Sequence, residues 1–259
     1  MRLTYPHMGE AYIAVKSLMD DIGVESVIPA FTTNSTLRLG SSLSPEAVCL
    51  PYKIMLGNYI NSISAGADTI LITGSCGPCR FGYYGPLQKQ ALWEAGYIDT
   101  DIIILDPPRE GYRKFLEALK KVAGKNSGRI IPSFINAYKV CCELDSMNEL
   151  LYYVRPRAFK KDELRSIMHE FKNDVMTVKG SGQMLELIHD TKNRIRGIDI
   201  DKSFKPLKIG IIGEIYTIIE PFSNLHTEER LGDLGVEVHR SMTVRDWARN
   251  NVILPATGR

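Results

Sequence analysis

Cysteine supplies the most reactive side chains in this chain, and it occurs in only three places. The five cysteines are Cys49, Cys76, Cys79, Cys141 and Cys142. Their number is odd, and the first residues, MRLTYPHMGEAY, lack the charged-then-apolar pattern of a signal peptide. We therefore expect a cytoplasmic protein with reduced thiols, in which cysteines bind metal, do redox chemistry or pack in the core.

Cys76 and Cys79 form a CxxC motif in the segment SCGPCRFG, directly after the β-branched run TILIT. A lone CxxC is compatible with a redox dithiol, half of a zinc site or part of a cluster motif. The redox interpretation expects a thioredoxin-like context, and a structural zinc site usually has a second CxxC or paired histidines, which this sequence lacks. An iron–sulfur cluster and a buried or redox cysteine pair both stay open.

Cys49 ends a short apolar run and precedes Pro51, which suits the first turn of a helix. Parallel strands end at one sheet edge, so we expect Cys49 and the CxxC pair to meet in one crevice at the carboxyl ends of strands. The N–H groups and positive charge of helix amino termini favour thiolates and the sulfurs of an anionic cluster. Arg80 adds a positive charge beside the pair.

The remaining cysteines and one histidine are weaker candidates. Cys141 shares a helical face with apolar neighbours, which is typical of core packing, but it is kept as a candidate cluster ligand. Adjacent helix positions point about 100° apart, so we expect at most one of Cys141 and Cys142 to bind a given iron. His7 follows the first predicted strand and is a candidate to line the crevice, with an ordinary loop histidine as the alternative.

The first 125 residues alternate between strand and helix patterns. Strands are predicted over residues 3–5, 24–29, 69–73 and 102–105. Helices are predicted over residues 10–21, 51–65, 86–95 and 109–122. This alternation predicts an α/β fold in which residues 1–125 form a Rossmann-like lobe with a doubly wound parallel sheet that carries the cysteine crevice.

The rest of the chain does not continue the alternation of strand and helix patterns. Residues 126–205 are predicted to be mainly helical. Residues 206–259 are predicted to form a second, short α/β lobe that is incomplete for a full domain. Its strands are expected over residues 208–213 and 236–239, and its helices over residues 222–234 and 244–251.

Composition excludes several partners. The net charge is +2 with mixed signs, and no basic stripe indicates a nucleic-acid surface. No apolar run is long enough to span a membrane. The sequence also lacks a P-loop and a GxGxxG dinucleotide fingerprint.

Five segments, in this order, resemble acyl-CoA dehydratase activase-related proteins, relatives of the 2-hydroxyacyl-CoA dehydratase subunits. They are TT at 32–33, CLPYK at 49–53, GAD at 66–68, GPCRFGYY at 77–84 and RP at 155–156. The resemblance runs along most of the chain, and CLPYK and GPCRFGYY are its most specific parts.

The resemblance implies a cofactor and a partner. Dehydratase subunits of this kind hold a [4Fe–4S] cluster between Rossmann-like lobes through three cysteines, with one iron site open. A separate ATP-hydrolysing activase supplies an electron for radical chemistry on a CoA thioester. By position, Cys49 and Cys79 match the first two ligand cysteines. The relatives continue into a further segment that supplies another cysteine, and this chain lacks that segment. The third cluster ligand is therefore expected to be Cys76, Cys141 or Cys142, or to come from a partner chain, or to be missing.

Three functions follow from this resemblance. The first is low-potential electron transfer or reduction of a small-molecule or CoA-ester substrate, with an ATP-dependent activase as electron donor. The second is a 2-hydroxyacyl-CoA dehydratase-type lyase, and the third is a non-catalytic cluster carrier or scaffold. The first and third are favoured because no acid–base pair for dehydration is evident. A homodimer is expected only by analogy, because a partner often closes an exposed cluster crevice.

Overall fold

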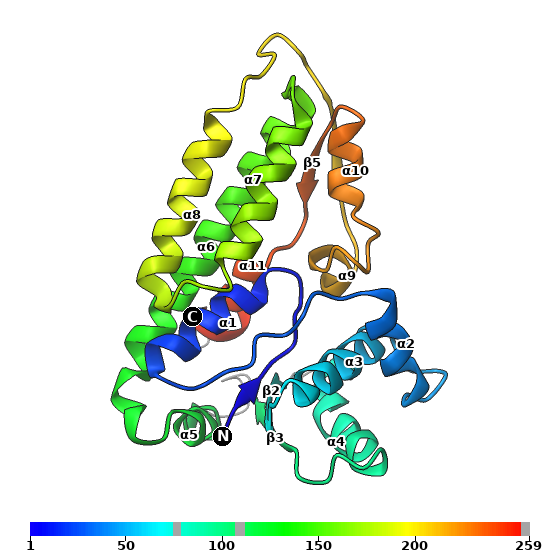
Figure 1. The fold of residues 1–259 in the computed structure, drawn as a ribbon, viewed down its shortest axis with the longest axis vertical. Helices are drawn as coiled ribbons and strands as arrows, with labels where there is room; N and C mark the ends of the chain where they lie inside the picture. The colour runs from blue at the N-terminus through cyan, green and yellow to red at the C-terminus, as the bar shows by residue number, and fades with distance from the viewer. Residues whose placement is uncertain (75–78, 107–111, 255–259) are drawn as a thin grey trace.

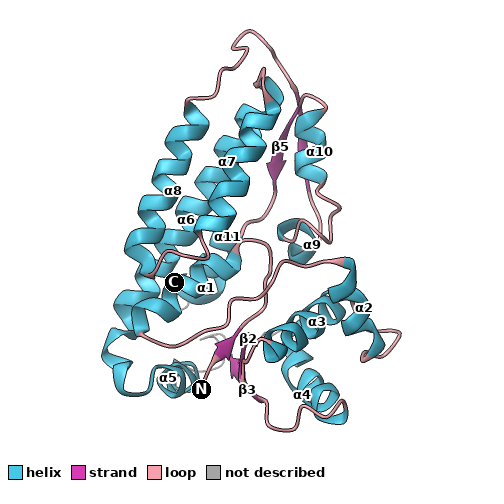
Figure 2. Ribbon diagram, in the orientation of Figure 1, coloured by secondary structure: helices cyan, strands magenta, loops and turns pink. Residues whose placement is uncertain are grey.

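The computed structural model describes residues 1–74, 79–106 and 112–254. A small sheet with its helices forms one end of the molecule, and long helices extend away from it beside a second sheet (Figure 1). Helices make up most of the described chain, and the strands are short (Figure 2). The predicted mixed α/β class is therefore confirmed in outline.

The first sheet is parallel and contains β1 (Leu3–Thr4), β2 (Thr69–Thr73) and β3 (Asp101–Leu105), in that order. Thr4 pairs with Ile70, and Thr73 pairs with Leu105. All but the last residue of β2 are buried, as expected for a β-branched strand at the centre of a parallel sheet. The predicted parallel sheet is present, whereas its Rossmann-like detail stays a prediction.

One predicted strand of this sheet is wrong. Residues 24–29 form no strand, and only Ser26 makes an isolated parallel bridge to Leu3. The Leu3 N–H donates to Glu25, and the Val27 N–H donates back to Leu3. Because β1 is only two residues long and Pro29 has no N–H to donate, the ladder cannot extend.

The helices around this sheet begin close to where they were expected. They are α1 (Ala11–Ile22), α3 (Leu50–Ser64), α4 (Tyr84–Glu94) and α5 (Tyr112–Ala123), with a 3-10 turn η1 (Arg80–Tyr83) before α4. The predicted start of the last helix lies outside the described residues.

A further helix, α2 (Asn34–Ser42), was not predicted. It begins at a capping box in which Thr33 and Thr36 bond reciprocally. It packs closely on α3, because a Cβ atom on Gly57 would lie 2.0 Å from the Thr36 carbonyl oxygen. The apolar run before Cys49 is the turn that joins these two helices, and Cys49 does not follow a strand as expected.

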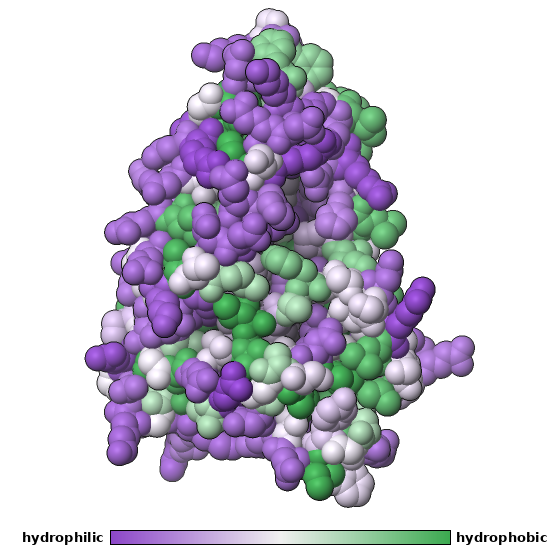
Figure 3. All heavy atoms as spheres, viewed as in Figure 1, coloured by the Kyte–Doolittle hydropathy of each residue, from purple (hydrophilic) through white to green (hydrophobic). Residues whose placement is uncertain are grey.

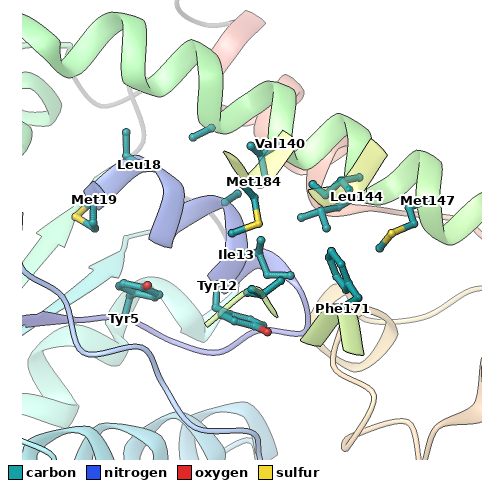
Figure 4. Close-up of a cluster of buried hydrophobic side chains, with 14 of the residues drawn as sticks. Tyr5, Tyr12, Ile13, Leu18, Met19, Val140, Leu144, Met147, Phe171 and Met184 are labelled. Carbon is teal, nitrogen blue, oxygen red and sulfur yellow. The ribbon is translucent and has the colours of Figure 1, made fainter. Parts of the chain in front are cut away.

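The middle of the chain is helical, as predicted. It contains η3 (Gly124–Arg129), α6 (Ile130–Val154), η4 (Arg155–Arg157), α7 (Lys161–Asp174) and α8 (Gly180–Arg196). Side chains of α1 are buried with those of the long helices, among them Ile13, Leu144, Phe171 and Met184 (Figure 4). This core therefore continues from the first predicted lobe into the helical segment, and the predicted domain boundaries remain a prediction.

The second sheet consists of β4 (Leu207–Ile211) and β5 (Val236–Arg240), which are parallel. Three short helices accompany it: α9 (Ile215–Ile219), α10 (Thr227–Asp233) and α11 (Val244–Ala248), the last continuing as a π-helical turn, η5 (Arg249–Ile253). The helix predicted over residues 222–234 begins only at Thr227, because Leu225 and His226 adopt the left-handed conformation. The predicted short α/β unit is therefore present as a two-stranded parallel sheet with short helices.

The surface of the helical end is mostly hydrophilic in the view of Figure 3. Among the described residues, no helix is long and apolar enough to cross a membrane.

Candidate cysteine site

Cys49 occupies the N-cap position of α3, with extended backbone angles and Pro51 in the first helical turn. The predicted helix start is therefore confirmed. The amide N–H groups of this first turn, and the partial positive charge of the helix end, lie next to the Cys49 residue. Cys49 is half-buried and packs against the apolar cluster that contains Tyr52 and Tyr84.

Cys79 occupies the N-cap position of η1, which leads directly into α4. It is free and exposed. The other member of the motif, Cys76, lies outside the described residues. Because the motif follows β2, Cys79 reaches the site from the carboxyl end of that strand, as the sequence predicts.

Tyr84 brings the two described cysteines together. Burial raises the pKa of the Tyr84 hydroxyl, and a hydrogen bond with Cys49 and the charges of Cys49 and Cys79 raise it further. Its ring packs edge-on against Tyr52 with centroids 5.2 Å apart, and it contacts Phe81 at 5.1 Å. The Cys49 thiol therefore bonds the buried Tyr84 hydroxyl, and Cys79, at the start of η1, lies near enough to act on the same hydroxyl electrostatically.

Cys141 and Cys142 lie elsewhere, on α6. Cys141 packs against the core shared by α1 and the long helices, and burial together with the charge of Asp145 raises its pKa to about 12. Burial also raises the pKa of Cys142, although a hydrogen bond with Tyr138 acts in the opposite direction. Cys141 packs against a different apolar cluster from the one that Cys49 joins. Among the described residues, no three His, Cys, Asp or Glu side chains gather as a metal site.

His7 follows β1, as expected, but it is buried and has a partner that the sequence did not indicate. Its Nδ1 lies 3.2 Å from a carboxylate oxygen of Glu220, which comes from the segment after α9. Tyr84 was recognisable only as part of the GPCRFGYY segment, whereas Glu220 gave no local signal. A pair so distant in sequence becomes visible only in the fold.

A cavity of about 370 Å³ lies between the helical segment and the second sheet. Its wall includes Glu10 and Ala11, Cys141 from α6, and Ile219 and Pro221 on either side of Glu220. This cavity is not predictable from the sequence, because its lining comes from elements scattered along the chain.

The chain matches no model of a known protein family and no curated protein sequence.

Proposed function

We propose that this chain is a cytoplasmic [4Fe–4S] protein, related to the 2-hydroxyacyl-CoA dehydratases, that takes low-potential electrons from an ATP-dependent activase. The observation that carries the proposal is that Cys49 and Cys79 each occupy the N-cap position of a helical element near Tyr84, with Cys49 bonded to its hydroxyl. Thiols in two separate elements that meet at helix starts suit an anionic cluster better than core packing does.

The proposed ligands are Cys49, Cys79 and Cys76. The first two supply thiolates beside backbone N–H groups, and Cys76 precedes Cys79 closely enough to reach the same group. Cys141 is a poor ligand in this assignment, because its raised pKa opposes the thiolate form that metals require. When bound, the cluster would supply one-electron chemistry, and an iron without a protein ligand would be open to a small-molecule or CoA-ester substrate.

The aromatic side chains beside Cys49 are compatible with electron transfer or reduction. Tyr52, Phe81 and Tyr84 pack around the site, and the pKa of Tyr84 is raised, so its hydroxyl stays protonated at neutral pH. Such a phenol can donate hydrogen bonds to sulfur, which is one way proteins adjust cluster potentials.

Anaerobic reconstitution with iron and sulfide tests the proposal. We expect a brown protein with about four irons per chain. Cys49→Ser and Cys79→Ser should each lose most of the iron, whereas Cys142→Ser, a cysteine change on α6, is the matched control and should keep it. A colourless protein that binds one zinc, or iron that survives both site changes, refutes the proposal.

The electron donor requires a separate measurement. The reconstituted protein, mixed with a purified activase, reductant and ATP, should give the electron paramagnetic resonance signal of a reduced cluster. A non-hydrolysable ATP analogue should not support that signal. A cluster that is bound but is never reduced by the activase would leave a carrier or scaffold role.

A further inference from the structure

The cavity between the helical segment and the second sheet has walls of two kinds. Its apolar wall consists of buried side chains, Leu144 and Leu151 on α6, Met168 on α7 and Ile219 on α9. Charged side chains line much of the rest. The volume of about 370 Å³ lies within the range of small-molecule pockets, which is about 300–1,000 Å³. A ligand that suits these walls combines an apolar body with charged groups.

Most of the charged side chains that line the cavity already have partners. Arg155 forms an ion pair with Glu229 at 3.1 Å, and the Arg165 guanidinium is paired with two aspartates. The Asp145 carboxylate accepts from the backbone N–H of Arg245 over 3.2 Å and lies 3.9 Å from its side-chain Nε. These groups therefore leave little charge for a ligand to compensate.

Glu10 is a carboxylate that lacks such compensation. It occupies the N-cap position of α1, but its side chain does not cap that helix and instead accepts from the side-chain amide of Asn148 over 2.7 Å. Among the described residues, no basic side chain forms an ion pair with it. A neutral amide leaves the negative charge in place, so this part of the cavity favours an ammonium group.

Arg240 on β5 presents the opposite charge to the same cavity. Its Nε donates to Glu228 over 2.7 Å, and its guanidinium carbon lies 5.3 Å from the centre of the Tyr152 ring. These contacts hold a side chain that is only 14% exposed. Its two terminal nitrogens have no hydrogen-bond partner in the part of the chain that the structure describes. The donors of a guanidinium fork match a carboxylate.

Glu10 and Arg240 are near each other without being paired. Burial would lower the pKa of the Arg240 guanidinium, but nearby negative groups, Glu10 among them, raise it. Glu10 thus acts on Arg240 electrostatically, yet the two form no ion pair. Lys172 on α7 also lines the cavity, and its positive charge offsets that of Glu10. A ligand without net charge but with both charged groups is therefore favoured, because a simple amine leaves the guanidinium fork empty and a simple acid is repelled by Glu10.

We propose that this cavity binds a small zwitterion of the α-amino acid class with an apolar side chain. Its ammonium group binds Glu10, its carboxylate binds the terminal nitrogens of Arg240, and its side chain packs on the apolar wall. The proposal does not depend on a cluster, because neither Cys49 nor Cys79 lines the cavity.

Isothermal titration calorimetry of the full chain at neutral pH, without added iron or sulfide, tests the proposal. The probes are valine, leucine and phenylalanine, each beside the analogue that lacks the amino group and the analogue that lacks the carboxylate. For phenylalanine, these analogues are phenylpropionate and phenethylamine. We expect at least one amino acid to bind with a dissociation constant of about 1 mM or less. Both of its analogues should bind at least about tenfold more weakly, because each loses one charge-assisted contact.

Two variants assign the charged groups of the ligand to their partners. Glu10→Gln can still accept from Asn148, so it should weaken binding of the amino acid by about tenfold or more and leave binding of the acid analogue unchanged or stronger. Arg240→Lys keeps a positive charge beside Glu228 but loses the fork, so it should weaken the amino acid and the acid analogue and spare the amine. Glu186→Gln, an exposed change on α8 outside the lining, is the matched control and should bind as the native chain does. Circular dichroism of each variant checks that it is folded.

Three results would each overturn the proposal. The first is that none of the three amino acids binds. The second is an amine or acid analogue that binds as tightly as the amino acid, because the cavity then recognises only one charged group. The third is folded Glu10→Gln that binds the amino acid as tightly as the native chain does, because the ligand then lies elsewhere.

Discussion

The tight crossing of α2 and α3 predicts an unusual response to Gly57→Ala. A Cβ atom at this position would lie 2.0 Å from the Thr36 carbonyl oxygen and 3.1 Å from the Gly40 amide nitrogen, where 3.4–4 Å is ordinary contact. Both neighbours are backbone atoms, so no side chain can rotate away. The two helices must instead separate by about 1 Å or more, and close-packed interiors resist such a shift.

The expected change in stability has the opposite sign to that of an ordinary helical glycine. Alanine in a helix is favoured over glycine by about 1 kcal/mol. Overpacking costs about 1–3 kcal/mol, and a backbone collision belongs at the upper end of that range. We therefore expect Gly57→Ala to lower the free energy of unfolding by about 2 kcal/mol net. Gly182→Ala on α8 is the matched control, because a Cβ atom there meets nothing within 4 Å, and it should be neutral or stabilising.

Urea denaturation of the two variants and the native chain, followed by circular dichroism, measures this difference as a shift in midpoint. The crossing also sets the position of Cys49, which caps α3. Gly57→Ala should consequently speed alkylation of Cys49 relative to Cys79, as followed by mass spectrometry. If Gly57→Ala is as stable as the native chain, or tracks Gly182→Ala, the close crossing is wrong.

Three further predictions follow from individual contacts. A thiol reagent near pH 8 should modify the exposed Cys79 well before Cys141, because burial raises the pKa of Cys141 to about 12. Mass spectrometry of the digested protein measures the order of modification. If Cys141 reacts first, its burial is wrong. Because the pKa of Glu220 is lowered on folding, its contribution to stability is present above the ordinary glutamate range and is lost as the pH falls through the lowered value. Thermal melts of Glu220→Gln should therefore lose less stability on acidification than the native chain does, and equal losses would contradict this. Thr33→Ala should cost about 1 kcal/mol by removing the cap of α2, while Thr33→Ser should restore most of it, and equal midpoints for the two in urea would show that the cap contributes nothing.

Secondary structure was predicted most accurately where the sequence carries a clear local signal. The run TILIT became β2, and the proline after Cys49 marked the start of α3. Both signals are local, because hydrophobic periodicity and the geometry of proline act within a few residues. The same local signals misread residues 24–29, which are apolar enough for a strand but find only a two-residue neighbour, β1, with which to pair. Strand formation depends on the partner as much as on the segment.

Helix α2 shows the opposite error, because local sequence preferences did not indicate a helix that the structure contains. Residues 34–42 contain serine, threonine, asparagine and glycine, which are poor helix formers on average. What stabilises α2 is the capping box at Thr33 and the close contact with α3 through Gly40 and Gly57. Tertiary contact therefore overrides propensity here, and a glycine that would weaken an isolated helix allows this one to pack.

The candidate site combines both kinds of information. A proline and a CxxC motif were enough to place Cys49 and Cys79 before helices, and each does occupy an N-cap position. That both lie near Tyr84 required the fold, because Cys49 reaches the site from a helical hairpin and not from the end of a strand. This difference matters for the proposed chemistry. A thiol at a strand end would be fixed by the sheet, whereas the position of Cys49 depends on how tightly α2 holds α3. We therefore expect that a change at the Gly40–Gly57 crossing alters the position of Cys49 relative to Tyr84 without touching a cysteine.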